Sequence, residues 1–160
     1  MTLLDHAAIA ARVPHAGAMC LLDSVVSWDE QHIECRAASH ASPTHPLAQD
    51  GRLPATAAIE YAAQAMALHG CLVHEQAGAA AAPRRGFLAA LRSVRLHCRW
   101  IDTAAAPLTV RASRFAGDEV QVLYDFEVEV EATGLLAAGR AVVVLDASAR
   151  VAAPAAAAQP

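Results

Sequence analysis

The stretch Leu53–Gly70, LPATAAIEYAAQAMALHG, decides the architecture of this chain. It is rich in good helix formers, has a proline at its start and ends at a glycine, which together indicate a helix. Glu60 is its only charged side chain. Because a surface helix of this length would carry a charged face, we expect other structure to wrap it.

Three polar residues of this helix, Thr56, Glu60 and Gln64, follow one another at intervals of four. Side chains at that spacing lie on one stripe of a helix. A carboxyl group on a wrapped helix is costly unless it is paired, hydrogen-bonded or protonated. The stripe is therefore a candidate site for acid–base chemistry, and we expect burial to favour the protonated form of Glu60.

The composition limits the functions that the chain can have. Its 160 residues predict one domain, and its 56% hydrophobic and 18% charged content predicts a buried core. The net charge of −4 and the absence of a basic cluster with interleaved aromatic residues argue against nucleic acid as a partner. Four scattered cysteines, no signal-peptide pattern and no uninterrupted membrane-spanning run predict a cytoplasmic protein.

Hydrophobic periodicity and turn residues predict the elements around the central helix. We expect a short helix at 2–12, strands at 20–28 and 32–38, a loop at 39–54, and a central helix from Pro54 to Gly70 that can extend to Gln76. After a connector at 77–83, strands are expected at 86–97, 107–115, 119–131 and 135–145.

This order predicts an α+β fold in which a long antiparallel sheet curls around one helix. We place the domain at residues 1–148 and expect the Ala/Pro-rich tail 149–160 to be disordered. One such sheet leaves a free edge and one end of the helix uncovered. We therefore expect a dimer, in which a second subunit covers both.

Three motifs resemble those of the hotdog-fold β-hydroxyacyl-acyl-carrier-protein dehydratases. They span about residues 10 to 146, and the helix motif is most similar to a divergent branch associated with aryl polyene biosynthesis. The motifs are Val13-Pro14-His15 with MCLLD at 19–23; LPA at 53–55 with Ile59-Glu60 and Ala63-Gln64-Ala65; and RGFL at 85–88 with RSVRL at 92–96.

The resemblance implies a hotdog fold and a reaction. Enzymes of this family convert 3-hydroxyacyl thioesters to trans-2-enoyl thioesters in fatty-acid-like pathways, on substrates carried by the phosphopantetheine arm of an acyl carrier protein. A histidine removes the C2 proton, and an acid on the central helix of the other subunit protonates the departing hydroxyl. No cofactor or metal is implied, and the sequence contains no HExxH, P-loop or Rossmann motif.

By this resemblance Glu60 is the acid, and Pro54, Ala55 and Thr56 form the helix start whose N–H groups hold the thioester oxygen. Gln64 either orients Glu60, binds substrate or is a satisfied core residue. His45 is the candidate base.

The histidine loop departs from the family pattern. The Phe-Pro-Gly that follows the family's histidine is absent after His45, and the loop is one residue longer. His40, in the same loop, is the alternative base. His15 lies in the N-terminal motif, where the resemblance implies a structural role.

Two other functions stay open. The chain can be a hotdog thioesterase, in which the helix acid activates water, or a non-catalytic dehydratase-like subunit of a heterodimer, which the altered histidine loop favours. Arginines after the helix predict a surface for the acidic carrier protein, with ordinary solvated strand ends as the alternative. They are Arg84, Arg85, Arg92, Arg95 and Arg99.

Overall fold

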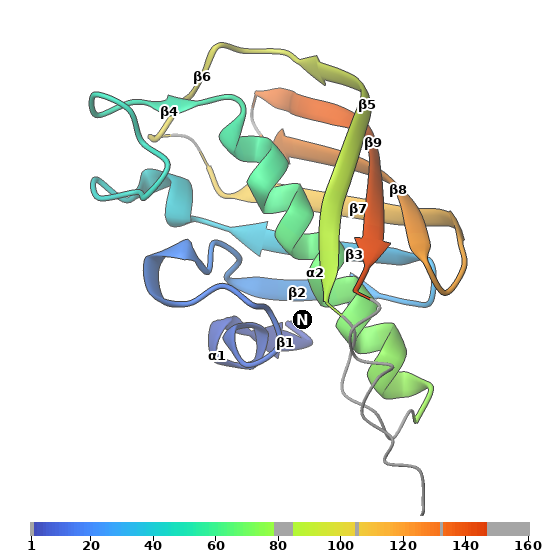
Figure 1. Cartoon of the computed structure of the whole chain (residues 1–160). Coiled ribbons are helices and arrows are strands. Elements are labelled where there is room, and N and C mark those ends of the chain that lie inside the picture. The colour runs from blue at the N-terminus through green and yellow to red at the C-terminus, as the bar shows by residue number, and fades with distance from the viewer. Residues whose placement is uncertain (1, 79–84, 105, 132, 147–160) are drawn as a thin grey trace, which may run out of the picture.

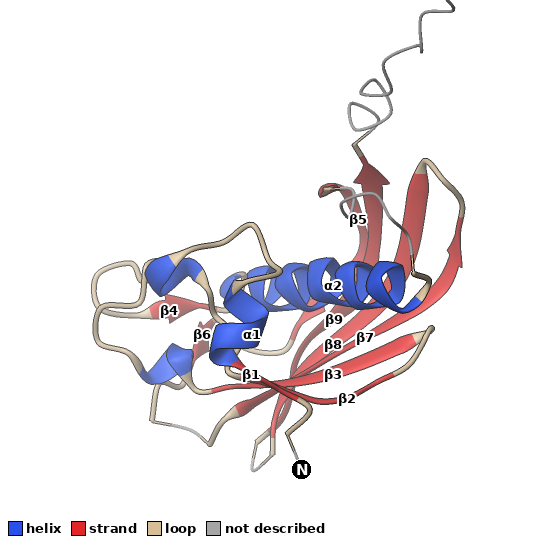
Figure 2. Ribbon diagram, turned by 90° about the horizontal axis from the view of Figure 1, so that it is seen from below, coloured by secondary structure: helices blue, strands red, loops and turns tan. Residues whose placement is uncertain are grey.

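The computed structural model describes residues 2–78, 85–104, 106–131 and 133–146. One long helix, α2, lies across the concave side of a curled antiparallel sheet (Figures 1 and 2). The expected α+β architecture is confirmed.

The helices are α1 (His6–Ala10) and α2 (Ala57–Gln76), with 3-10 turns η1 (Gly17–Met19) and η2 (Ser39–Ala41). The strands are β1 (Leu4–Asp5), β2 (Ser24–Trp28), β3 (His32–Ala37), β4 (Leu53–Pro54), β5 (Gly86–Leu96), β6 (Trp100–Ile101), β7 (Leu108–Gly117), β8 (Gln121–Val130) and β9 (Gly134–Leu145).

Seven strands form the main sheet in the order β1-β2-β3-β7-β8-β9-β5, and every pair is antiparallel. Strict alternation along β8 sets which face meets the core. Val122, Tyr124, Phe126, Val128 and Val130 are buried, while intervening residues are more exposed. The strand order places the long strand β5 at one edge of the sheet and the two-residue strand β1 at the other.

Helix α2 is buried mainly on its sheet side. Tyr61, Ala62, Ala65 and Leu68 have no exposed surface. The opposite side is only half-buried, so the expectation of a helix without a solvent face is wrong for the single chain. The sheet curls around the helix so that β5 passes in front of α2 (Figure 1), but a cavity lined by residues of both elements lies between them. The partly exposed stripe comprises Ile59, Glu60, Ala63 and Ala67 and ends at the exposed Gly70.

The N-terminal predictions need correction. The predicted helix at 2–12 is limited to α1, because the Asp5 side chain accepts a hydrogen bond from Ala8 N–H and caps the helix there. The preceding residues Leu4–Asp5 pair with β2 as a strand. The predicted strand at 20–28 begins only at Ser24, because η1 ends at Met19 and the chain then crosses to the sheet edge.

The start of the central helix also differs from the prediction. Pro54 lies in the short strand β4, which pairs with the unpredicted strand β6, and α2 begins at Ala57. The cross-strand pair of Pro54 with Trp100 holds the proline in extended backbone, so it precedes the first helical turn. The helix does extend to Gln76. Most of the connector at 77–83 and the whole tail 149–160 lie outside the described residues.

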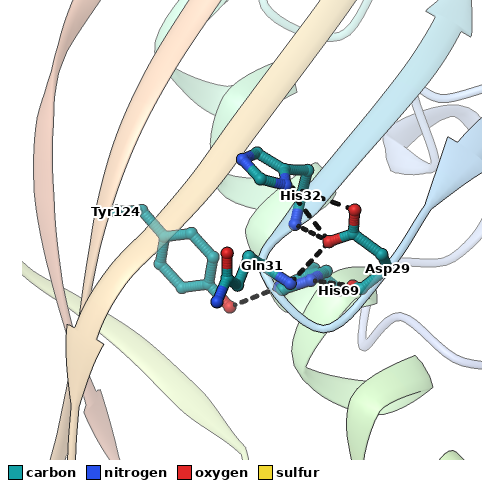
Figure 3. A network of polar contacts seen from close by, with 5 residues as sticks. All are labelled: Asp29, Gln31, His32, His69 and Tyr124. Carbon is teal, nitrogen blue, oxygen red and sulfur yellow. Dashed lines mark hydrogen bonds and ion pairs between the residues drawn. The ribbon is translucent and has the colours of Figure 1, made fainter.

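A buried histidine attaches the C-terminal half of α2 to strand β8 and to the turn between β2 and β3. His69 Nδ1 contacts the Tyr124 hydroxyl at 2.9 Å, and its Nε2 donates to the Asp29 carbonyl at 2.8 Å (Figure 3). Asp29 in turn accepts from the backbone N–H groups of Gln31 and His32, which closes the β2–β3 turn. These bonds fix the rotation of α2, and therefore the direction of its polar stripe.

No helix within the described part of the chain has the length and apolar character needed to cross a membrane.

Candidate active site

Glu60 is held by the next polar residue of its own stripe. Gln64 Nε2 donates to Glu60 Oε1 at 3.0 Å and to the carbonyl of Met19 at 2.7 Å. Gln64 Oε1 accepts from Leu21 N–H at 2.9 Å. These backbone partners fix the orientation of the amide, because only its oxygen can accept from Leu21. Gln64 is therefore a fully bonded core residue that also orients Glu60, and its amide leaves no donor for substrate.

His15 is the site residue that the sequence did not identify. Its Nε2 lies 3.1 Å from Glu60 Oε1, and both side chains are 30% exposed. The segment between α1 and β2 supplies this imidazole together with the backbone partners of Gln64. The motif Pro14-His15 followed by MCLLD gave the only signal, because it places a histidine shortly before residues that contact the helix.

The exposure of Glu60 corrects the expectation of a fully buried carboxyl. Its side chain is 30% exposed in the single chain, so the fold alone removes it only partly from water. Oε1 receives the contacts from Gln64 and His15, whereas no hydrogen bond or ion pair from the described residues reaches Oε2.

The start of α2 offers two backbone donors, one residue later than predicted. The N–H of Ala55 donates to the Arg99 carbonyl at 3.0 Å, so it is occupied. The N–H groups of Thr56 and Ala57 make no hydrogen bond within the described residues. The first N–H groups of a helix have no partner within the helix and attract anions. Pro54, Ala55 and Thr56 remain the predicted substrate-binding segment, with Thr56 and Ala57 as its donors.

Three cavities follow the partly exposed side of α2 and share lining residues. The first, of 660 Å³, lies between the helix start and Arg99, and it shares Pro54 and Thr56 with the second, of 290 Å³, beside Leu47. Glu60 belongs to the second and to the third, of 310 Å³. The third, which we call the Met66 cavity, lies between α2 and β5, and its apolar lining includes Ala63, Met66, Ala67, Phe87, Leu88 and Val143.

His45 is buried and fully hydrogen-bonded. Its Nδ1 accepts from Leu47 N–H at 3.1 Å, so its Nε2 carries the proton and donates to the Tyr61 hydroxyl at 3.1 Å. Tyr61 then donates to Ser39 Oγ, and Ser39 donates to the Leu21 carbonyl, each at 2.7 Å. To accept a proton, His45 must give up one of its two bonds. No hydrogen bond between described residues joins His45 to Glu60.

Burial, followed by the nearby His40, lowers the pKa of His45 below its usual value. The ring is therefore neutral at neutral pH, which is the form that a base requires. Burial also raises the pKa of Tyr61 to about 12, so this phenol stays protonated and keeps its place in the chain of bonds. His40 itself is 1% exposed.

The predicted arginine surface is divided among different parts of the molecule. Arg85 lines the Met66 cavity, Arg99 lines the cavity at the helix start, and Arg95 lines a 470 Å³ groove on the sheet. Arg84 lies outside the described residues. Beside the helix start, Arg52 and Arg99 instead approach the ring of Trp100, at 4.2 and 5.7 Å from its centroid. In the described part of the chain, no group of three or more His, Cys, Asp or Glu side chains is placed to hold a metal ion.

Comparison with solved structures defines the class of fold. The chain resembles the PaaI protein from the E. coli phenylacetic acid degradation operon (16% identity, TM-score 0.57, covering 87% of this chain and 88% of that one). It also resembles a thioesterase from Haemophilus influenzae (15% identity, TM-score 0.54, covering 77% of each chain). At these identities the likeness concerns the fold alone, which is the expected hotdog fold.

A more similar structure and a family model narrow the class. The dehydratase heterocomplex ApeI:P from Xenorhabdus doucetiae contains a chain that is 26% identical, with a TM-score of 0.74 over 88% of this chain and 91% of that one. The ApeP-like family model, described as ApeP dehydratase, matches residues 7–156. The chain therefore belongs to the ApeP-like family of hotdog dehydratases, as the helix motif predicted. No curated protein matched the chain.

Proposed function

We propose that this chain takes part in the dehydration of 3-hydroxyacyl thioesters to trans-2-enoyl thioesters, with Glu60 as the acid that protonates the departing hydroxyl. The observation that carries the proposal is the position of Glu60. It lies on the partly exposed side of α2, between an apolar cavity and two helix-start N–H groups that have no hydrogen-bond partner among the described residues. A 3-hydroxyacyl thioester has the matching order of groups, namely a carbonyl, a hydroxyl and an acyl chain.

The reaction can be followed along α2. The thioester oxygen accepts from Thr56 and Ala57 N–H, which stabilises the enolate that forms when a histidine removes the C2 proton. The C3–O bond then breaks, and the Glu60 carboxyl donates its proton so that water leaves. The rest of the acyl chain lies in the Met66 cavity. Proton transfer by positioned groups typically contributes about 10²–10⁴-fold to the rate.

A partner subunit completes this site. The edge strand β5 exposes Phe87, Leu88 and Leu91 by 57, 41 and 37%, and its outer edge pairs with no strand in the part of the chain that the structure describes. A long free edge with exposed apolar side chains favours pairing with another sheet. The likeness to a chain of the ApeI:P heterocomplex supports a related dehydratase as the partner. Pairing there covers the open side of α2 and brings a histidine of the partner subunit toward Glu60.

His45 remains our proposed base for the second, symmetry-related site. Its bonds to Leu47 and Tyr61 make that site the less favourable one, since a buried group that loses its partner costs about 1–3 kcal/mol. The same bonds favour the second candidate function, in which this chain is inactive alone and contributes Glu60 to a heterodimer.

The cationic entrance supports a carrier-bound substrate. Arg99 lines the cavity at the helix start, and Arg52 stacks on the adjacent Trp100. Cations at this position suit the phosphate of phosphopantetheine and the acidic surface of a carrier protein. We therefore propose that the phosphopantetheine arm enters at Arg99 and that the acyl carrier protein is the partner in the reaction.

The test is turnover of 3-hydroxyacyl thioesters, on carrier protein and on coenzyme A, by the chain alone and after co-expression with a related dehydratase. We expect Glu60→Gln to reduce dehydration by about 10²–10⁴-fold. The matched control is Glu127→Gln, an exposed carboxylate on β8 that should leave the rate unchanged. Undiminished activity in Glu60→Gln contradicts the proposal, and release of free thiol without an enoyl product supports a thioesterase instead.

A further inference from the structure

Within the described part of the chain, His15 has one polar contact, and that contact is with Glu60. Among the described residues, its Nε2 meets only Glu60 Oε1, while its buried Nδ1 has no hydrogen-bond partner. By contrast, both ring nitrogens of His69 make hydrogen bonds, to Tyr124 and to Asp29. The polar contact of His15 is thus directed at the carboxyl of Glu60.

The two oxygens of Glu60 have different surroundings. Gln64 donates to Oε1 in every protonation state, because its own oxygen is committed to Leu21 N–H. An Nε2–H on His15 gives Oε1 a second donor. An oxygen that already accepts two hydrogen bonds is a poor place for a proton, so a protonated Glu60 carries its proton on Oε2. That oxygen has no partner among the described residues.

We propose that His15 is a positioning residue that, together with Gln64, anchors Oε1 of Glu60 and thereby presents Oε2 as the oxygen that delivers the proton to the departing hydroxyl. The inference rests on the proposed function and adds a specific role within one subunit. His15 also lines the Met66 cavity beside Glu60, so the anchored carboxyl faces the space assigned to the acyl chain.

The test compares two variants of His15 with Glu60→Gln, in whichever assembly shows turnover. His15→Phe keeps the ring volume and removes the donor. We expect kcat to fall about tenfold to a hundredfold with little change in KM, because the lost hydrogen bond is to the carboxylate charge that develops as Glu60 releases its proton. His15→Gln places an amide N–H near the former Nε2 and should stay within about threefold of the parent. A structural role would change the melting temperature, or KM, in both variants.

A double variant separates action through Glu60 from an independent effect. If His15 acts through Glu60, His15→Phe adds no further loss to Glu60→Gln. Undiminished kcat in His15→Phe, an equal loss in His15→Gln, or fully multiplicative losses in the double variant overturn the inference. If Glu60→Gln itself has no effect, the proposed function fails instead, so the two failures are distinguishable.

Discussion

At the scale of single residues, two buried histidines tie the stability of the fold to pH. Burial is the main cause that lowers the pKa of His45 and of His69 below the usual value. The side chain of Asp29 accepts hydrogen bonds from the backbone N–H groups of Gln31 and His32, which lower its pKa. Protonation of Asp29 therefore affects stability only at more acidic pH. Just below the ordinary histidine pKa, the change of the free energy of unfolding with pH therefore reports on the imidazoles of His45 and His69.

The sign follows from proton binding. Below about pH 6.5, these histidines bind protons in the unfolded chain, whereas their lowered pKa keeps them neutral in the folded chain to more acidic pH. The free energy of unfolding is therefore expected to fall from pH 7 toward 5, by at most about 1.4 kcal/mol per pH unit for each histidine. Denaturant unfolding across this range is the measurement. We expect a smaller slope in His69→Gln and His45→Gln, whereas an unchanged slope in both variants contradicts the assignment.

At the scale of elements, one side of α2 is buried against the sheet, and the other side lines cavities that a substrate can enter. Its small residues pack against the sheet and also leave room beside β5, where Ala67 lines the Met66 cavity. The sequence alone could not separate these uses, because alanine serves close packing and open space equally well. The difference arises from how the sheet surrounds the helix, because α2 packs against β3, β7 and β8, whereas a cavity lies between α2 and β5.

Narrowing this cavity should change substrate length preference. Ala67→Leu adds three carbon atoms to the wall, so we expect kcat/KM for long-chain thioesters to fall about tenfold or more, with short-chain substrates affected little. Ala77→Leu, at the exposed end of α2, is the control. A series of 3-hydroxyacyl thioesters of increasing length makes the measurement. An equal loss for every chain length would place the acyl chain elsewhere.

At the scale of the whole molecule, β5 is the longer of the two edge strands of the main sheet, and no strand among the described residues pairs with its outer edge. Leu91 is 37% exposed on β5 and lines none of the three cavities along α2, so it probes association without altering those cavities. Leu91→Glu should weaken dimerisation at least about tenfold, because a charge buried in an interface without a partner is costly. Activity that needs the partner should fall in parallel.

The matched control is Val120→Glu, because Val120 is 61% exposed in the turn between β7 and β8. Sedimentation or light scattering over a range of concentrations measures both variants. If Leu91→Glu associated as strongly as the parent, β5 would be excluded as the subunit interface.

Local sequence determined most of the fold. The apolar stretch around Glu60 predicted the long helix α2, and alternation predicted β8, because helical and strand periodicities are properties of neighbouring residues. The capped start of α1 and the strand at Pro54 were missed, since a hydrogen bond and a distant strand decide them. The motifs also indicated the family and selected Glu60 and Gln64, which are four residues apart on one helix.

Only the tertiary structure decided what surrounds the carboxyl. The contact of His15 with Glu60 joins residues that are distant in sequence, and the bond of His45 to Tyr61 turns its imidazole toward a buried phenol. Neither contact has a periodic signal, because each depends on how separate segments pack against α2. The sequence thus specified Glu60 and Gln64, to which we assign a role in the proposed reaction, whereas packing determined which oxygen of Glu60 and which imidazole lie beside one another.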